Sequence, residues 1–311
     1  MGAERPVIFL MGPTASGKTD LAIRLAAELP VDLISVDSGM VYRGLDIGTA
    51  KPEPETLARA PHRLIDICDP AESYSAGRFR RDALREIAAA RARRRIPLLV
   101  GGTGLYFRTL QRGIARLPEA DPGIRARLLA EAGEQGWPAL HARLAQVDPA
   151  AARRIRPRDR QRIQRALEVY EATGVPLTEL QQRAHRKTPA YRPFEIVLAT
   201  PDRELGRRRI EDRFHGMLER GFLDEVAALY RRGDLGPALP SMRLVGYRQA
   251  WQYLAGELDR PEMVRRAVVA TRQLAKRQRT WLRAEREAEW FDPDTRNLVD
   301  KVLKFLGPAL T

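Results

Sequence analysis

The chain has 311 residues, of which 44% are hydrophobic and 30% charged, and this composition excludes a collagen-like, mucin-like or wholly disordered protein. No apolar stretch reaches the roughly 18 residues that cross a bilayer, and no secretory signal follows the N-terminus, so we expect a cytoplasmic protein. The 54 Lys and Arg residues exceed the 40 Asp and Glu residues by 14, which favours a nucleic-acid partner, although an arginine bias can also reflect genomic base composition.

The first hundred residues alternate between strand and helix patterns. Predicted strands span residues 7–11, 33–37, 64–67 and 98–100, and predicted helices span residues 18–29 and 75–95. Strands separated by helices predict a parallel sheet of the α/β class with right-handed crossovers.

The pattern changes near residue 115. Only helical patterns follow, among them residues 160–172, until a strand-like run returns at 194–200. Long helices are then predicted over residues 203–232 and 262–289. We therefore predict an α/β core with C-terminal basic helices, made of residues 1–115 and 194–311, and an all-helical insertion domain over residues 116–193.

Residues 12–19 read GPTASGKT and fit the phosphate-binding loop (P-loop) pattern G-x-x-x-x-G-K-[ST] between a buried strand and a helix. Glycines let the backbone wrap a phosphate, and the helix N-terminus attracts an anion. Lys18 adds a positive charge, and the Thr19 hydroxyl is a candidate Mg²⁺ ligand. The motif predicts a polyphosphate ligand, but it specifies neither ATP nor hydrolysis.

Two further segments end at the edge of the predicted sheet where ligands bind. Asp37 follows the second strand, as a candidate Mg²⁺ ligand, partner of another site residue or general base, and a helix N-cap or Asx-turn is the non-catalytic alternative. The glycine-rich residues 101–104 follow the fourth strand, where either a ligand or another protein segment approaches the backbone closely.

The predicted helix over residues 262–289 has a cationic face and an apolar face. The cations are Arg265, Arg272, Lys276, Arg279, Arg283 and Arg286, and the opposite face carries Met263, Ala267, Ala270, Leu274 and Trp281. Because like charges at this spacing repel each other, we interpret the cationic face as a phosphate-backbone contact. A solvated face neutralised by nearby acids is the alternative. A second cationic cluster spans residues 158–165.

Seven motifs occur in a fixed order: GPTASGKT at 12–19, ISVDS at 34–38, YR at 42–43 with DIGTAKP at 46–52, LVGGTGLY at 99–106, QRIQRALEVY at 161–170, VGYRQ at 245–249 and TRQLAKRQ at 271–278. Together they resemble the bacterial tRNA dimethylallyltransferase (tRNA isopentenyltransferase) family from about residue 7 to residue 283. The resemblance implies a P-loop NTPase-like fold and a prenyltransferase that uses Mg²⁺. It would transfer a dimethylallyl group from dimethylallyl diphosphate to N6 of the adenine adjacent to the anticodon, giving N6-dimethylallyladenosine.

The same resemblance implies roles for individual residues. The diphosphate would bind Gly12, Pro13, Thr14, Ala15, Ser16, Gly17, Lys18 and Thr19. Lys18, Thr19 and Arg213 would stabilise the departing diphosphate, and Asp37 would accept a proton from the attacking amine or hydrogen-bond to it. We expect a monomer that binds the tRNA anticodon stem-loop and does not associate with a membrane.

The resemblance also implies contacts with tRNA in several segments. They comprise Asp37, Ser38, Gly39, Met40, Thr103, Arg125, Gln161, Arg162, Ile163, Gln164, Arg165, Met242, Arg243, Leu244, Val245, Gly246, Tyr247, Ala275, Lys276, Arg277, Gln278, Arg279, Thr280, Trp281 and Leu282. Two residues depart from the family pattern: Gly39 is less bulky than expected, and Gly104 stands where related sequences can carry a larger residue.

Two other functions use some of the same features. A P-loop small-molecule kinase would share the fold and the phosphate loop, with Asp37 activating a hydroxyl group, but it would need neither the cationic helix nor the helical insertion. A non-catalytic RNA-binding protein would not need the intact Lys18, Thr19 and Asp37.

Overall fold

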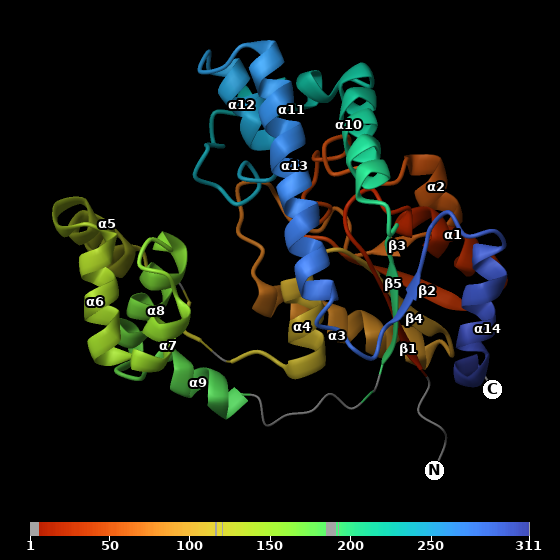
Figure 1. Ribbon diagram of the computed structural model, residues 1–311, viewed down its shortest axis with the longest axis horizontal. Helices are drawn as coiled ribbons and strands as arrows, with labels where there is room; N and C mark the ends of the chain where they lie inside the picture. Colours follow the sequence, from red (N-terminus) through yellow and green to blue (C-terminus); the bar gives the residue numbers. More distant parts are fainter. Residues whose placement is uncertain (1–5, 116, 120, 185–190, 192, 311) are drawn as a thin grey trace. The chain divides into compact units, whose positions relative to one another are not determined.

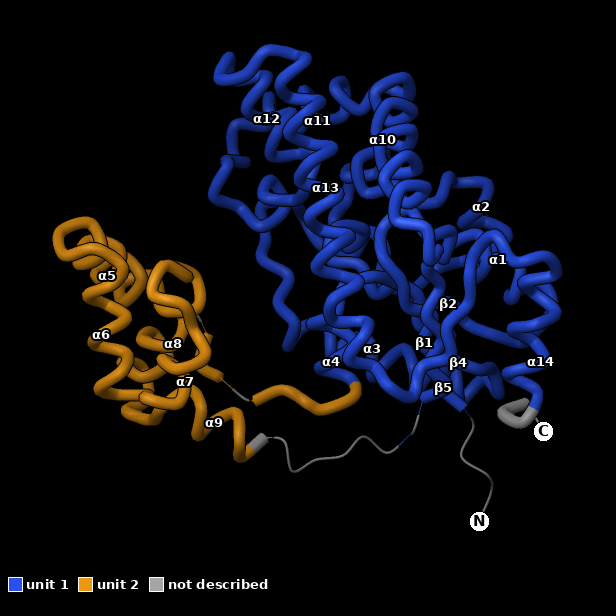
Figure 2. Tube along the Cα trace, in the orientation of Figure 1, with its two compact units in different colours: residues 1–110, 190–311 blue, residues 111–189 orange. Residues whose placement is uncertain are grey.

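The computed structural model describes residues 6–115, 117–119, 121–184, 191 and 193–310. Contacts divide the chain into two compact units (Figure 2): unit 1 is residues 1–110 with 190–311, and unit 2 is residues 111–189. The first division comes earlier than the predicted boundary at 115/116, directly after Leu110, whose side chain is buried in the core of unit 1.

Unit 1 is built on a six-stranded sheet in the order β3-β2-β4-β1-β5-β6 (Figure 1). The strands are β1 Val7–Met11, β2 Val31–Val36, β3 His62–Arg63, β4 Ile96–Gly101, β5 Pro193–Leu198 and β6 Glu289–Phe291. All neighbouring strands pair in parallel. Every residue of β1 and β4 is buried, as is typical of a parallel sheet covered on both faces. The predicted α/β class is confirmed.

Helices cover both faces of this sheet. They are α1 Lys18–Glu28, α2 Pro54–Arg59, α3 Ala76–Ala92, α4 Gly104–Arg112, α10 Arg203–Glu219, α11 Phe222–Tyr230, α12 Tyr247–Leu254, α13 Arg260–Leu282 and α14 Leu298–Leu310. Apolar side chains of α1 and α14 form one core with the sheet, and α3, α4 and α10 to α13 contribute to a second core. None of the described helices is long and apolar enough to span a bilayer.

All regular secondary structure among the described residues of unit 2 is helical. Its helices are α5 Pro122–Gln135, α6 Trp137–Val147, α7 Pro149–Arg154, α8 Arg160–Thr173 and α9 Leu177–Ala184. They enclose a separate apolar core that includes Leu128, Leu140 and Leu167. The Asp121 side chain caps α5 by accepting hydrogen bonds from two backbone N–H groups, and Pro122 begins the helix.

The prediction of a strand at 64–67 was wrong. Leu64 and Asp66 have φ angles of 64° and 57°, which are incompatible with an extended strand, and the pairing with β2 lies at His62–Arg63 instead.

The predicted helices of the C-terminal region also needed correction. The single helix predicted over 203–232 is two helices, because Gly221 adopts a φ of 90° between α10 and α11. The helix predicted to end at 289 stops at Leu282, and residues 289–291 join the sheet as β6.

Candidate active site

The P-loop occupies the turn between β1 and α1. Gly17 adopts a φ of 78° at the N-cap of α1. A Cβ atom on Gly12 would lie 2.3 Å from the Leu198 carbonyl oxygen, so only glycine lets the loop pass the end of β5 at this distance. The Lys18 Nζ donates a hydrogen bond to the Pro13 carbonyl across the loop at 2.6 Å. The strand, turn and helix context required of a phosphate-binding loop is therefore present.

A cavity of about 550 Å³, here called the main cavity, lies beside the P-loop within unit 1. The four residues predicted to be catalytic, Lys18, Thr19, Asp37 and Arg213, all line it. They come from α1, from the loop after β2 and from α10. The fold thus brings the predicted catalytic set together, while their individual roles stay predictions.

The charges in the main cavity are unbalanced. Burial and the nearby Arg213 lower the pKa of Lys18 to about 7, and Asp37 acts in the opposite direction. Burial likewise lowers the pKa of Arg213, which Asp37 raises. Lys18 and Arg213 share this poorly solvated space with the Asp37 carboxylate, so an anion bound between the two cations would relieve their repulsion.

Asp37 both shapes its loop and faces the main cavity. Its Oδ1 accepts hydrogen bonds from the backbone N–H groups of Gly39 at 2.7 Å and Met40 at 3.3 Å, which is an Asx-turn. Among the described residues, Oδ2 has no hydrogen-bond donor in the structure. The predicted alternatives, an Asx-turn and a chemical role, are therefore compatible.

The glycines at the end of β4 and directly after it are closely approached by neighbouring protein segments. A Cβ atom on Gly101 would lie 2.1 Å from the Val36 carbonyl oxygen. On Gly102 it would lie 2.4 Å from Nε2 of Gln278, and on Gly104 it would lie 2.5 Å from the Trp281 ring. The departure at Gly104 thus has a steric explanation. These residues also line the main cavity, which makes the turn both a structural element and part of the site.

Many residues predicted to contact tRNA lie around the main cavity. Those that line it are Asp37, Ser38, Gly39, Met40, Thr103, Leu244, Val245, Gly246, Tyr247, Arg277, Gln278 and Trp281. Met242 and Leu282 are buried in the core of unit 1, so their side chains support these segments from within. Arg243 is exposed.

Ala275, Lys276, Arg279 and Thr280 lie on α13 of unit 1. The remaining predicted tRNA contacts, Arg125 and residues 161–165, belong to unit 2, where a buried carboxylate organises two of them. Glu168 has no solvent exposure, and it pairs with Arg125 at 3.3 Å and with Arg165 at 3.2 Å. Ile163 lies in the apolar core, whereas Gln161 and Arg162 are exposed and Gln164 is half-buried. Glu168 lies within the QRIQRALEVY motif, but it was not predicted as a functional residue, since an acid within a helix usually faces solvent.

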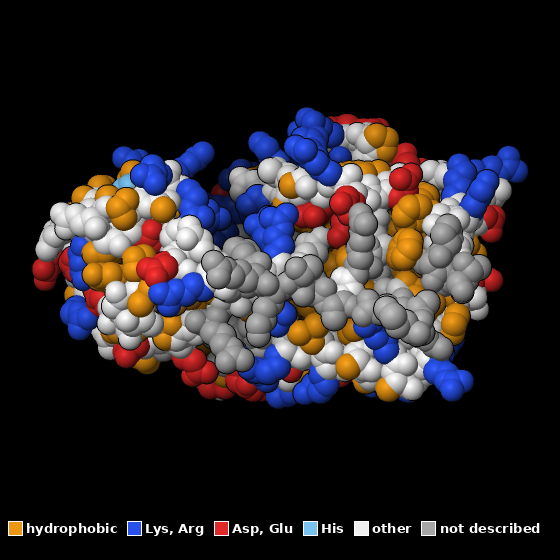
Figure 3. Space-filling model, turned by 90° about the horizontal axis from the view of Figure 1, so that it is seen from below, with side chains coloured by type: hydrophobic (Ala, Val, Ile, Leu, Met, Phe, Trp, Pro, Cys, Tyr) orange, Lys and Arg blue, Asp and Glu red, His pale blue; other side chains and the backbone are white. Residues whose placement is uncertain are grey.

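A second cavity of about 560 Å³ is also lined by the P-loop residues Pro13, Thr14, Ala15 and Ser16. Its cations are Arg203, Arg207, Arg272, Lys276, Arg279 and Arg283. By contrast, the surface in Figure 3 carries Lys and Arg side chains interspersed with Asp and Glu. The described lining of the second cavity thus carries six cations and no acid.

The cations predicted to share one face of α13 have different surroundings in the structure. Arg265 pairs with Glu262 at 2.6 Å, which fits the alternative of a neutralised surface. Lys276 and Arg279 line the second cavity, and the Arg279 Nη2 also donates to the Thr200 carbonyl at 2.8 Å. Arg286 lies beyond the end of the helix.

Sequence reasoning missed the apolar part of the main cavity. Its apolar lining includes Ile210, Phe214, Met217, Phe222, Leu244 and Leu274. Most of these residues sit on helices at a spacing that is equally typical of an ordinary core. The main cavity therefore has a cationic region beside the P-loop and an apolar wall, and a ligand that fits it must match both.

Comparisons with known proteins agree on one family. A family model described as IPP transferase matches residues 40–285. A tRNA dimethylallyltransferase from Thioalkalivibrio sulfidiphilus is 62% identical over 279 residues, which cover 90% of this chain and 87% of that relative. The structure of the full-length tRNA isopentenylpyrophosphate transferase from Bacillus halodurans is 35% identical with a TM-score of 0.73, covering 99% of this chain and 97% of that one. The structure of a eukaryotic dimethylallyltransferase acting on tRNA is 26% identical with a TM-score of 0.82, covering 98% and 80%.

Proposed function

We propose, because this chain belongs to the IPP transferase family, that it is a tRNA dimethylallyltransferase that modifies N6 of the adenine adjacent to the anticodon. The family resemblance, the P-loop NTPase-like fold and the class of enzyme predicted from the sequence are confirmed. The alternative of a small-molecule kinase is not favoured. The donor, the residue roles, the metal and the monomeric state stay proposals.

The unbalanced charge of the main cavity is the observation that carries the choice of donor. Arg213 lies close enough to lower the pKa of Lys18, and the Asp37 carboxylate raises the pKa of both cations. A diphosphate would supply the missing negative charge. The apolar wall, with Phe214 and Met217, suits a five-carbon isoprenoid group. Dimethylallyl diphosphate combines both chemistries.

The proposed reaction is a substitution at the allylic carbon of the donor. The N6 amine of adenine forms a new bond to that carbon, and the bond between the carbon and the diphosphate oxygen breaks. Lys18 and Arg213 stabilise the charge on the departing diphosphate, where the bond breaks. Asp37 accepts the proton lost by N6, and its Oδ2 is the atom assigned to this step.

The target adenine must leave its base stack, which costs a few kcal/mol. A weak amine nucleophile gains most from being held close to the carbon, so positioning carries much of the rate. The loops 37–40 and 244–247 line the main cavity and are the proposed receiving surface for the extruded base.

Mg²⁺ is proposed as a cofactor bound mainly through the diphosphate. Among the described residues no three His, Cys, Asp or Glu side chains gather to hold a metal. The Thr19 hydroxyl lines the main cavity, and it fits the usual Mg²⁺ site in which substrate phosphates and water supply the remaining ligands. When bound, the ion would neutralise charge on the leaving diphosphate.

The test is a transfer assay with labelled dimethylallyl diphosphate, Mg²⁺ and unmodified tRNA. We expect label in tRNA, at N6 of the adenine adjacent to the anticodon. ATP-dependent phosphorylation of a small molecule without label in tRNA would support the kinase instead. Tight tRNA binding without transfer would support a non-catalytic RNA-binding protein.

A further inference from the structure

The Glu225 carboxylate joins two loops that are far apart in the sequence. It lies in the first turn of α11 and accepts hydrogen bonds from three consecutive backbone N–H groups. They belong to Asp46 at 2.9 Å, Ile47 at 2.7 Å and Gly48 at 3.2 Å. The hydroxyl of Tyr247 donates to the same carboxylate. One side chain therefore satisfies four donors from two separate segments.

The two segments also pack against each other without spare room. A Cβ atom on Gly48 would lie 2.6 Å from the Tyr247 ring. A Cβ atom on Gly39 would lie 2.9 Å from the Thr49 methyl group and 3.3 Å from the Leu244 side chain. All five residues line the main cavity. A shift of either loop would therefore change the shape of this wall.

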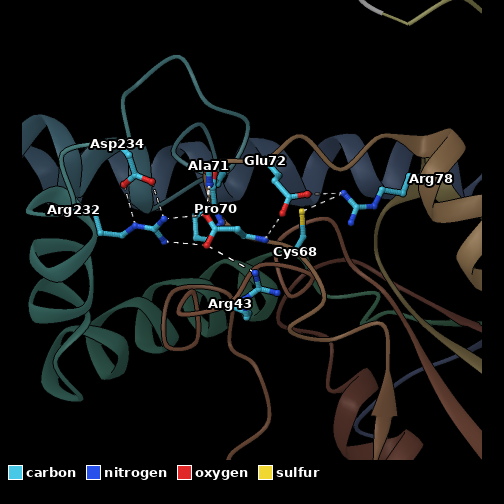
Figure 4. Close-up of polar contacts among 10 residues, drawn as sticks. Arg43, Cys68, Pro70, Ala71, Glu72, Arg78, Arg232 and Asp234 are labelled. Carbon is cyan, nitrogen blue, oxygen red and sulfur yellow. Dashed lines mark hydrogen bonds and ion pairs between the residues drawn. The ribbon is translucent and has the colours of Figure 1, made fainter.

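Other contacts fix the loop that Glu225 binds and the helix α11 that carries Glu225. The buried ammonium of Lys51 donates to the Tyr42 carbonyl at 3.0 Å and pairs with Asp46, which fixes the end of the first loop. Figure 4 shows Arg232, just beyond α11, between Asp234 and the segment around Pro70. Because α11 is anchored at that end, Glu225 at the other end acts from a fixed position.

We propose that Glu225 is a positioning residue for tRNA: it holds residues 37–50 and 242–247 together as the surface that receives the target base. This inference rests on the proposed function. Among the described residues, the hydrogen-bond partners of the Glu225 carboxylate are Asp46, Ile47, Gly48 and Tyr247, and none of them belongs to the P-loop. Loss of Glu225 should therefore weaken the use of tRNA and spare the use of the donor.

The neighbouring Asp224 provides a matched control. It is an exposed acid in the same first turn of α11, so it shares the favourable position at the helix N-terminus. Glu225→Gln keeps the shape of the side chain but replaces one acceptor oxygen with a donor amide, which cannot accept the loop N–H groups. Asp224→Asn removes the same charge without touching the loops.

Steady-state transfer assays on the full chain are the first measurement. We expect Glu225→Gln to raise KM for tRNA by about tenfold, equivalent to one strong hydrogen bond, with KM for the donor within about twofold of the wild type. Tyr247→Phe removes one of the four donors, and it should shift KM for tRNA in the same direction by less. Asp224→Asn should match the wild type in both constants.

Hydrogen exchange by mass spectrometry is the second measurement. The backbone amides of residues 46–48 should exchange about tenfold faster in Glu225→Gln than in the Asp224→Asn control. Unchanged exchange with an unchanged KM for tRNA would overturn the inference. So would an equal rise in both KM values, or faster exchange throughout unit 1, because either result means a general loss of stability.

The proposed function can fail separately. If the wild-type protein moves no dimethylallyl group to tRNA, that function is wrong. The dissociation constant for tRNA and the exchange of amides 46–48 then decide the inference, since neither requires turnover.

Discussion

The P-loop is tied to α13 by one amide side chain. The backbone N–H of Thr14 donates to Oε1 of Gln278 at 2.8 Å, and Nε2 of Gln278 donates to the Gly102 carbonyl at 3.0 Å. The P-loop and the glycine turn after β4 are thus connected through a residue more than 170 positions later in the chain. Gln278 was predicted as a tRNA contact, and the structure gives it this additional role.

Gln278→Leu should loosen the P-loop. Two hydrogen bonds are lost, and each contributes about 0.5–1.5 kcal/mol, so we expect the free energy of unfolding to fall by about 1–3 kcal/mol. KM for the donor should rise by about tenfold, because the loop amides are less well positioned. Gln273→Leu, at an exposed position of the same helix, is the control. Equal behaviour of the two variants would contradict the prediction.

The lowered pKa of Lys18 predicts a dependence of donor binding on pH. With a pKa of about 7, Lys18 is largely neutral at pH 8 in the free protein, whereas a bound diphosphate favours the ammonium form. Binding at pH 8 should therefore take up close to one proton, and affinity should fall as the pH rises above about 7. Isothermal titration in buffers of different ionisation enthalpy measures this uptake.

Lys18→Met is the control for that titration. It removes the group but leaves the diphosphate to titrate by itself, so the difference between the two proteins isolates Lys18. Proton uptake that persists unchanged in Lys18→Met would assign it to the ligand. Uptake in the wild type that is as large at pH 6 as at pH 8 would also contradict the pKa near 7.

Asp37→Asn separates the structural role of Asp37 from its proposed chemistry. The amide oxygen can still accept the N–H groups of Gly39 and Met40, so the loop should keep its turn. An amide cannot take the proton from N6, and kcat should fall by about 10²- to 10⁴-fold while the dissociation constant for tRNA stays the same. Asp20→Asn, an exposed acid in the first turn of α1, is the control. An unchanged kcat would remove Asp37 as the base.

Local patterns predicted the parts of the fold and site that depend on local physics. The strand at Val7–Met11 and the P-loop after it were predicted correctly because an apolar run and a glycine turn leave their mark in adjacent residues. The position of Asp37 after the second predicted strand marked it as a candidate, the family resemblance added Arg213, and the fold places both in one cavity. Because Asp37 and Arg213 are far apart in the chain, the hydrophobic periodicity of the sequence alone could not predict that they share a cavity.

The remaining features depend on contacts between distant segments. Glu225 sits in an ordinary amphipathic helix, and only the folded chain places three loop N–H groups against it. The strand expected at 64–67 failed for a related reason: its apolar residues pack into the core from a turn with positive φ angles. Hydrophobicity predicts burial, but it does not fix the backbone conformation that achieves it.

Gly104 is expected to be intolerant of even a methyl group. Its Cβ would lie 2.5 Å from the Trp281 ring, which is itself stacked on Phe107 with centroids 6.1 Å apart. Gly104→Ala should lower the free energy of unfolding by about 1–3 kcal/mol through overpacking. Gly216→Ala, in α10 with open space around the added methyl group, should instead raise it by about 0.5–1 kcal/mol. Denaturant unfolding measures both, and a neutral Gly104→Ala would contradict the steric argument.

A substitution at Glu168 separates two effects on tRNA binding: the orientation of Arg125 and Arg165, and the net charge of the protein. Glu168→Gln adds one positive charge to the protein, which alone would strengthen binding to an anionic RNA. It also releases Arg125 and Arg165 from the buried carboxylate that orients them. We expect the loss of orientation to dominate and the dissociation constant for the anticodon stem-loop to rise by about fivefold, which corresponds to about 1 kcal/mol.

The exposed Glu134→Gln changes the charge of the same unit equally and should bind as tightly as the wild type or slightly better. Filter binding over a range of salt concentrations distinguishes the two effects, and tighter binding by Glu168→Gln would show that Arg125 and Arg165 contribute charge without a required geometry.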